Sequence, residues 1–520
     1  MKQKRLFVVV ISALVIMISV TYQGTYSYFT SRVEGTGNTE NNQSQVNTIT
    51  LKNLIISEGA NVTSSNMIPG DSVEYTFIVE NPNNIDVCYN LLWTDVINTF
   101  VNKNDLYYRL YLNDMDVPSS YGVFPSETDG TVSLLDGMHI SANTTYTFTL
   151  VVTYDETDED QSADIGKTFS GKIIGELGEC SSMTLVDWIK SDSVVTSGEG
   201  LYEISHADAS ITYTDDATII NNLQQTELRY VGYHPYVYFN EELWQVIGLV
   251  NTPEGQRVKI MRDEPIGAYS WDTSSEEVNG GYGINQWGES TYQDGSVYNG
   301  ADLMKLLNPG YEANIDILTS YDEETSASTS DEGLVNNSLY WNRGSGACYN
   351  SNNNDYENCD FTDIGLTEKA KSMIDKVTWN TGAVTSDDIS SITTLEDIQR
   401  IYELERSNNT DTGSACTDED YCTDTVNRTT SWTGYVGLPS LSDYYYRYGW
   451  DTATTYINMA VGASITSVEE LRYSPIIRSM VGDKGKGLSY PAASPGPIYP
   501  TVYLKTDVKA SGAGGIGILY

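Results

Sequence analysis

The chain has 520 residues, more than one hydrophobic core usually serves, so two or more domains are expected. Its 71 acidic and 29 basic side chains give a formal net charge of -42. Such a charge repels phosphate backbones and anionic headgroups, which argues against nucleic acid as a partner.

The first residues have the layout of an export signal. Lys2, Lys4 and Arg5 precede an apolar run over 6–20, which is shorter than the roughly 20 residues of a membrane-spanning helix. We expect 1–27 to be a cleaved signal peptide, with an uncleaved N-terminal anchor as the alternative. Either way the rest of the chain is expected outside the cell or at its surface, and membrane contact only through an uncleaved anchor.

A polar stretch follows and then the pattern changes to short strands. Residues 28–47 are rich in Asn, Gln, Thr and Gly without periodicity, which predicts a flexible segment. Val73, Tyr75, Phe77 and Val79 then alternate with polar residues, as in a half-buried antiparallel strand. Further strands are predicted over 87–93, 106–112, 145–154 and 168–174. This spacing predicts a β-sandwich over 48–180, as in immunoglobulin-like folds.

Two short motifs accompany this pattern: TYSYFT at 25–30 and IPGDSVEYTFIVEN at 68–81. Together they resemble the TasA and camelysin family of exported Gram-positive matrix proteins. The resemblance implies a jelly-roll-like sandwich, processing by a dedicated signal peptidase, and subunits that build the fibres of a biofilm matrix. By that analogy 28–54 would donate a strand to a neighbouring subunit; the alternative is that it only spaces or covers its own sandwich. Cys88, Cys180 and a second large region depart from the family's pattern.

The cysteines are expected to form disulfides, because exported proteins occupy compartments where disulfides persist. Cys348 and Cys359 bracket one polar loop, Cys416 and Cys422 bracket another, and Cys88 and Cys180 remain for each other. Zinc binding is the competing idea, but no CxxC pair is present and the chain has 3 histidines.

One stretch is dense in carboxylates, the hard oxygen ligands that calcium prefers. The weak candidates for a metal site there are Asp155, Asp158, Asp160 and Asp164. The stretch lacks the spacing and the glycine of an EF-hand, so a solvated loop tip is the alternative. Calcium is the one cofactor considered, and none other is expected.

The remainder predicts a connector over 181–228 and an α+β region over 229–520. A short amphipathic helix is expected over 184–190, and three strands over 237–239, 243–250 and 257–262 form a meander. Helices are predicted over 301–308, 368–377 and 395–406, the last two capped by Thr367 and Thr394, and a late strand over 501–504.

Several segments of this region carry a further resemblance. Examples are RYVGYHPYVYFNEELWQVIGLV at 229–250, LYWNRGSGACYN at 339–350 and YPTVYLKTDV at 499–508. They resemble uncharacterised surface proteins of gut Firmicutes, a family without established chemistry. The closing strand is also similar to those of lectin-like and sulfatase-modifying-factor-like folds, and the first of these implies a lectin-like domain.

Catalytic motifs are absent: the sequence contains neither HExxH nor a GxSxG elbow, so an enzyme is not expected. Trp341 and Trp432 lie in segments rich in Asn, Gly and Tyr, and exposed aromatic faces there suit sugar or protein ligands; core packing is the alternative. The sequence predicts an exported structural or adhesive protein of the cell surface or extracellular matrix. A lectin-like ligand-binding module is the alternative, and the expected partners are other copies of the chain, host or matrix proteins, or glycans.

Overall fold

The computed structural model describes residues 54–56, 61–113, 115, 118–126, 131–205, 226–269, 290–292, 297–298, 301–309, 315–320, 330–335, 340–341, 343, 345–350, 355–360, 365–380, 394–407, 426–427, 431–448, 477–480, 487–490, 496–511 and 516–520. All of them belong to the compact unit Lys52–Tyr520. The predicted signal or anchor, the flexible segment and nearly all of the predicted donor strand lie outside these residues. In this part of the chain no helix is both long and apolar enough to cross a membrane.

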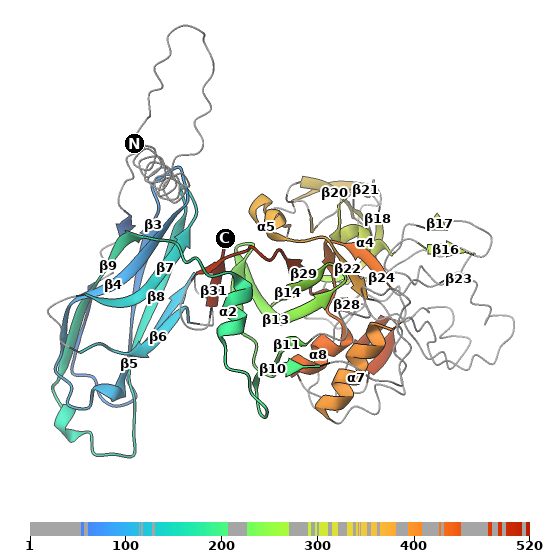
Figure 1. The fold of residues 1–520 in the computed structure, drawn as a ribbon. Coiled ribbons are helices and arrows are strands. Elements are labelled where there is room, and N and C mark those ends of the chain that lie inside the picture. Colours follow the sequence, from blue (N-terminus) through green and yellow to red (C-terminus); the bar gives the residue numbers. More distant parts are fainter. Residues whose placement is uncertain are drawn as a thin grey trace, which may run out of the picture. The chain divides into compact units, whose positions relative to one another are not determined.

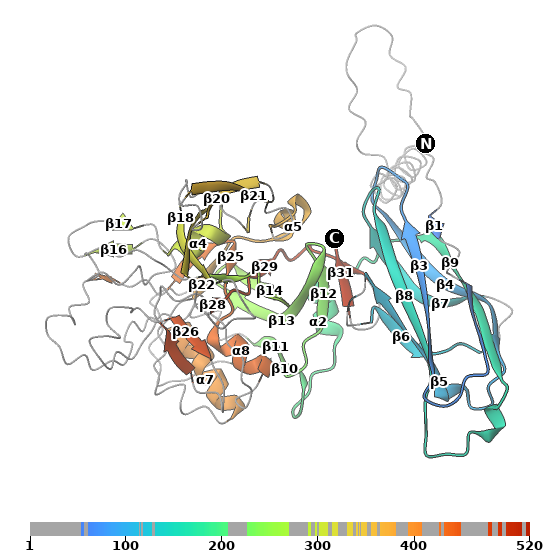
Figure 2. The ribbon, with the colours of Figure 1, turned by 180° about the vertical axis from the view of Figure 1, so that it is seen from behind.

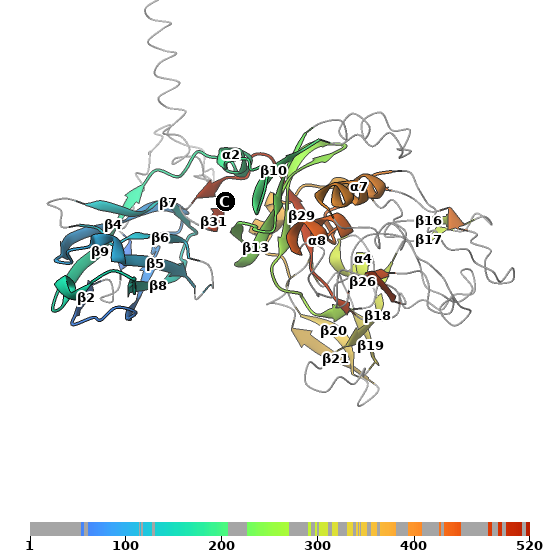
Figure 3. The same ribbon diagram turned by 90° about the horizontal axis from the view of Figure 1, so that it is seen from below.

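The first part of the chain is a sandwich of two antiparallel sheets that lie face to face (Figure 3). One sheet has the order β1-β3-β8-β5-β6 and the other β2-β9-β4-β7. The strands of the first are β1 (Ile55–Ile56), β3 (Ser72–Glu80), β8 (Thr145–Tyr154), β5 (Leu106–Leu112) and β6 (Ser120–Val123). Those of the second are β2 (Asn61–Ser65), β9 (Thr168–Gly178), β4 (Val87–Asn98) and β7 (Val132–Ile140). The predicted sandwich and mainly-β fold are confirmed.

Alternation along the strands makes the core of this sandwich. In β8 every second side chain is buried, among them Phe148 and Leu150, because successive side chains of a strand point to opposite faces. Between the sheets the fully buried ring of Trp93 meets Phe124 edge-on, with ring centroids 5.1 Å apart. Burying each such large side chain stabilises the fold by about 1.5–3 kcal/mol.

A disulfide joins Cys88 to Cys180, as the sequence predicts. Cys88 lies on β4 opposite Gly178 of β9, and Cys180 follows two residues later, so the bond ties the ends of two neighbouring strands. It closes a loop of 92 residues. In the chain-entropy model such a loop contributes about 4–5 kcal/mol.

The second part of the chain is built on a nine-stranded sheet (Figure 1). Seven of its strands have the order β25-β29-β14-β13-β12-β31-β30. The other two branch from this path, because β11 pairs with β13 and β10 pairs with β11. Its strands are β10 (Gly200–Ile204), β11 (Glu227–Val231), β12 (Tyr236–Phe239), β13 (Glu242–Thr252), β14 (Gly255–Arg262), β25 (Val436–Gly437), β29 (Thr501–Leu504), β30 (Ala510–Ser511) and β31 (Ile516–Leu519). The predicted meander is β12-β13-β14, and the predicted late strand is β29, which pairs with β14.

A glycine allows two strands of this sheet to approach closely. Gly248 of β13 has φ +151°, and a Cβ there would lie 2.2 Å from the carbonyl oxygen of Leu228 on β11. The register of β13 against β14 shifts between Val246 and Gly248. Such a bulge re-aims the strand, and only glycine fits at this position.

Among the residues that the structure describes, five helices pack around the sheet: α2 (Leu185–Ser191), α4 (Asp302–Leu307), α5 (Glu368–Met373), α7 (Leu395–Glu405) and α8 (Leu441–Tyr448). Thr367 caps α5, and Thr394 forms a capping box with Asp397 at the start of α7, as predicted. In α7 the buried positions Ile398 and Tyr402 are four residues apart and thus share one face. Figures 1 and 3 show α7 beside α8.

The segment 181–228 is expected to connect the two regions, and its described residues contribute to the second. Leu185 and Ile189 of α2 are buried in the core that includes Trp244 of β13, and β10 pairs with β11 along its whole length. The second region as described therefore begins at α2.

Short strands complete the described structure. They are β15 (Ala268–Tyr269), β18 (Ile315–Ser320), β19 (Ser330–Val335) and β28 (Gly496–Pro497) in one sheet, and β16 (Ser290–Tyr292), β17 (Val297–Tyr298) and β23 (Val426–Asn427) in another. The two-stranded sheets are β20 (Ser345–Asn350) with β21 (Asp355–Asp360), β22 (Val377–Asn380) with β24 (Ser431–Gly434), and β26 (Ile477–Met480) with β27 (Gly487–Tyr490).

The other predicted disulfides involve two places in this region. Cys348 and Cys359 lie on the facing strands of the β20-β21 hairpin (Figure 2), where Cys348 is paired with Glu357 and Cys359 with Gly346. Their bond stays a prediction. Cys416 and Cys422 lie outside the described residues.

Candidate ligand-binding surface

Trp341 and Trp432, the two candidate ligand residues, lie in the second region and are both partly exposed. Trp341 follows the buried Tyr340, whose backbone is hydrogen-bonded to Leu306 at the end of α4. Trp432 is the second residue of β24 and lies opposite Trp379 of β22. Both side chains also pack against the hydrophobic core, which is the packing alternative of the sequence analysis, and ligand contact stays a prediction.

The two tryptophans belong to a set of five rings that we call the aromatic strip: Trp341, Tyr435, Trp432, Trp379 and Tyr503. The Trp341 and Tyr435 ring centroids are 4.6 Å apart, and those of Trp379 and Tyr503 are also 4.6 Å apart. Trp379 reaches the Trp432 ring at 6.5 Å. Trp379 and Tyr503 are buried, whereas the other three rings are partly exposed. The strip thus has a buried inner pair, Trp379 and Tyr503, with Trp432 beside it, and a second pair, Trp341 and Tyr435, that is partly exposed.

Gly434 allows the Trp432 ring to lie across its own strand. A Cβ at Gly434 would fall 1.9 Å from the edge of that ring, a distance that no side chain tolerates. The carbonyl oxygen of Gly434 also accepts a hydrogen bond of 3.2 Å from the indole N–H of Trp379. The orientation of both tryptophans therefore depends on this glycine.

Three lysines meet the aromatic strip. The Nζ atom of Lys371 lies 5.9 Å from the Trp341 ring centroid, and that of Lys376 lies 5.7 Å from the Tyr435 centroid. Lys259 is 5.4 Å from the centroids of both Trp379 and Tyr503. A cation within about 6 Å of an aromatic face is attracted by its quadrupole. Lys371 also pairs with Glu368, with 2.8 Å between Nζ and Oε1, and Lys259 pairs with Asp443.

A buried charge network holds the third lysine. The Nζ atom of Lys259 lies 2.5 Å from Asp443 Oδ2, and Arg229 donates to Asp443 Oδ1. Arg229 also lies 3.9 Å from Glu227. These four side chains are 0–2% exposed, so no ligand reaches them in this structure. The network therefore positions Lys259 against the inner rings.

The pKa of Asp443 reports the strength of this network. Burial alone would raise the pKa, but the ammonium of Lys259 and the guanidinium of Arg229 outweigh burial and hold the pKa of Asp443 well below its usual range. Glu405 behaves in the opposite way. Burial raises its pKa, although Ser442 donates two hydrogen bonds to it.

The acidic stretch proposed for calcium does not bring its carboxylates together. Asp155, Asp158 and Asp160 are exposed, whereas Asp164 is buried and accepts a hydrogen bond from the backbone N–H of Val101. Among the residues that the structure describes, no group of three or more His, Cys, Asp or Glu side chains is arranged to hold a metal ion. Calcium binding here stays a prediction.

The comparisons with known proteins leave the family open. No family model matches the chain, and no curated protein matches it. A solved structure titled "AvmM Catalyzes Macrocyclization in Alchivemycin A Biosynthesis" aligns with 25% of this chain and 93% of its own, at 13% identity and a TM-score of 0.12. That similarity is too low to bear on the chemistry of this chain.

The sequence pointed to two members of the strip and missed the rest. Tyr435 is three residues from Trp432 and could have been found by that proximity, but Trp379 and Tyr503 come from other strands. Lys371 and Lys376 carry no motif. The arrangement offers flat aromatic faces with ammonium groups beside them, which suits ligands that combine an apolar face with negative charge.

Proposed function

We propose that this chain is an exported adhesive protein of the cell surface or extracellular matrix, whose second region binds a glycan that carries carboxylate groups. One observation carries the proposal: the partly exposed Trp341 and Tyr435 rings have Lys371 and Lys376 at their faces. A sugar ring stacks its C–H face on an aromatic ring, and its carboxylate pairs with an ammonium group. The proposal thus joins the adhesive and the lectin-like functions predicted from sequence.

Two further features support an extracellular role. The Cys88–Cys180 disulfide is of the kind that persists in oxidising compartments. The predicted export signal precedes the sandwich. The N-terminal residue of the protein recovered from its native location shows whether this signal is cleaved. Fibre assembly through 28–54 belongs to the same proposal, and electron microscopy of mature protein that shows only monomers would remove it.

The binding test compares two ligands and three variants by isothermal titration calorimetry. A uronic-acid oligosaccharide is expected to bind more tightly than its carboxyl-reduced, uncharged counterpart. Trp341→Ala is expected to weaken binding about 10-fold through loss of stacking, and Lys376→Gln to abolish the preference for the charged ligand. Tyr121→Ala, which removes an exposed ring from the sandwich strand β6, is the matched control and is expected to change nothing.

The result that contradicts the proposal is equally defined. The proposal is contradicted if neither oligosaccharide binds the unaltered protein, or if both bind Trp341→Ala as tightly as they bind the unaltered protein. Circular dichroism of each variant separates lost binding from lost folding, since Trp341 also packs on the core.

A further inference from the structure

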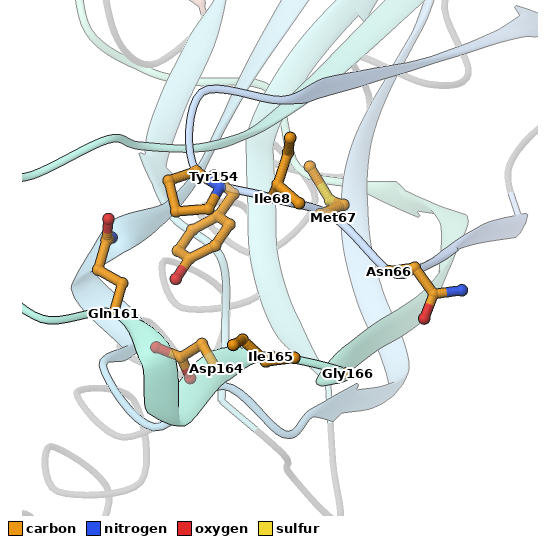
Figure 4. A pocket seen from close by; sticks show the side chains of 9 residues that line it. Asn66, Met67, Ile68, Tyr154, Gln161, Asp164, Ile165 and Gly166 are labelled. Atoms are coloured by element: carbon orange, nitrogen blue, oxygen red, sulfur yellow. The ribbon is translucent and has the colours of Figure 1, made fainter.

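A small pocket opens at one end of the sandwich. Its lining residues belong to other elements than the aromatic strip and are distant from the strip in sequence. It encloses about 220 Å³ and is lined by three segments: the turn between β2 and β3, the end of β8, and the loop that precedes β9. That loop contains the one-turn helix η4 (Ser162–Asp164). The lining residues drawn in Figure 4 include Met67, Ile68, Tyr154, Asp164 and Ile165.

The rim of the pocket is apolar and open to solvent. Ile165 is 81% exposed and Ile68 is 64% exposed, both high values for large apolar side chains. Val101 does not line the pocket, but its N–H donates to the lining residue Asp164, and its side chain is also exposed. Exposed apolar groups gathered around a concavity are typical of an interaction site, whereas single exposed ones need no explanation.

The floor of the pocket carries a polar group without a partner. Tyr154 is 1% exposed, and its hydroxyl has no hydrogen-bond partner within 3.5 Å among the described residues, although it faces the Asp164 carboxylate. In Figure 4 this hydroxyl points toward the turn that carries Gln161 and Asp164. A buried hydroxyl that is left unpaired costs free energy, so a ligand that supplies a partner is favoured.

Two neighbours of this hydroxyl are held in place from behind. Gln161 donates to Asp105 Oδ2 at 2.8 Å and to the carbonyl oxygen of Asp155 at 2.9 Å. Asp164 is 3% exposed and accepts the Val101 N–H, which fixes the carboxylate at the pocket wall. Burial, the nearby carboxylates of Asp164 and Asp105, and a long hydrogen bond from the phenol to Asp164 raise the pKa of Tyr154. The phenol is therefore neutral, and its oxygen has lone pairs to accept a hydrogen bond.

The charge around the pocket selects the sign of the ligand. Asp155, Glu156, Asp158, Glu159 and Asp160 precede Asp164 in the same loop, and Glu156 reaches to within 3.8 Å of the Cβ position of Gly70, beside the lining residue Pro69. These exposed carboxylates raise the local concentration of cations. A calcium ion would need six to eight oxygen ligands, and no cluster of three acidic or histidine side chains is present in the described part of the chain.

We propose that this pocket binds a primary alkylammonium group, held by the Asp164 carboxylate and the Tyr154 hydroxyl, with its alkyl stem against Met67, Ile68 and Ile165. An ammonium has three donors and no acceptor, which fits two oxygen acceptors at the end of an apolar channel. The group has two sources, a free amine or a lysine side chain of a protein partner. The stem of lysine packs on apolar surface while its head group pairs with a carboxylate.

Ligand-observed NMR with the whole protein tests the site and separates the sources. The probes are n-butylamine, its uncharged analogue n-butanol, and Nα-acetyl-lysine N-methylamide, whose blocked ends imitate a lysine within a chain. Butylamine is expected to bind at least about 10-fold more tightly than butanol, because the pocket contributes a charged hydrogen bond. A lysine of a partner protein is indicated if the blocked lysine binds at least as tightly as butylamine, and a free amine if it binds more weakly.

Variants locate the binding. Asp164→Asn is expected to weaken butylamine about 10-fold and Tyr154→Phe about threefold, since the first removes a charge and the second one acceptor. Asp160→Asn, an exposed acid of the same loop, is the matched control and is expected to change the affinity less than twofold. If Asp164→Asn does not fold, Ile165→Ser decides, because its side chain is exposed and contributes only to the stem contact.

The proposal is overturned by either of two results. In one, butylamine binds no more tightly than butanol. In the other, Asp160→Asn weakens butylamine as much as Asp164→Asn does, or Ile165→Ser leaves it unchanged, which would mean that loop charge alone attracts the amine.

Discussion

The two regions of this protein bury different chemistry in their cores. In the sandwich the space between the sheets is filled by apolar and aromatic side chains such as Trp93 and Phe148, and the buried carboxylates Asp105 and Asp164 lie in short turns at its margin. In the second region, Arg229, Lys259 and Asp443 are buried beside the central sheet.

This difference separates two ways of stabilising a fold. Apolar burial tolerates small changes because each contact contributes a little and neighbours can shift. A buried charge network does not tolerate such changes, because the removal of one charged side chain leaves its partner buried without an opposite charge. A substitution in the buried charge network is therefore expected to cost the second region more stability than a small change in the apolar core costs the sandwich.

The largest effect is expected from Asp443→Asn, which keeps the size of the side chain and removes its charge. Lys259 and Arg229 then lose their shared anion, so the second region should lose about 3–5 kcal/mol of stability. Hydrogen exchange read by mass spectrometry measures this in β14, while peptides from β4 report on the sandwich. Asp375→Asn breaks a part-exposed pair with Arg257 and, as the control, should cost about 1 kcal/mol or less. Equal losses in the two variants would contradict the role assigned to the network.

A smaller effect, about 2–5 kcal/mol, is expected in the sandwich from the double substitution Cys88→Ser with Cys180→Ser. The loss arises because the unfolded chain regains the freedom of a loop of 92 residues. Exchange in β4 and β9 should accelerate while β14 is unaffected. If β14 responds as strongly as β4, the two regions do not unfold separately and the comparison between them fails.

The smallest effect is a difference in acid sensitivity. The pKa of Asp443 is lowered in the folded protein, so its contribution is present above the unfolded value of about 3.9 and is lost as the pH falls through that value toward the folded one. The second region should therefore weaken as the pH drops below about 5. Because the pKa of Glu405 is raised, Glu405 weakens the fold as the pH rises, which is the opposite sense. Comparing the pH profile of Asp443→Asn with that of the unaltered protein separates the two effects. An unchanged pH profile in that variant would exclude Asp443 as the cause.

Much of the architecture follows from local patterns. Alternation predicted β3, because a half-buried strand must place every second side chain in the core, and β5 and β8 were predicted as further strands of the same domain. Thr367 and Thr394 predicted the starts of α5 and α7, since a helix N-terminus needs acceptors for its free N–H groups. The Cys88–Cys180 pairing followed from assigning the other four cysteines to near neighbours.

The sequence by itself therefore determined the mainly-β fold, many of the longer strands, the caps of α5 and α7, and the two tryptophans worth testing. Only the tertiary structure decided what surrounds them. Lys259 and Asp443 are 184 residues apart, and Arg229 and Asp443 are 214 apart, so nothing local distinguishes Asp443 among 71 acidic residues. The inner rings of the aromatic strip and the unpaired Tyr154 hydroxyl are likewise products of folding. Periodicity reports which way a side chain points, whereas its partners depend on how distant segments pack.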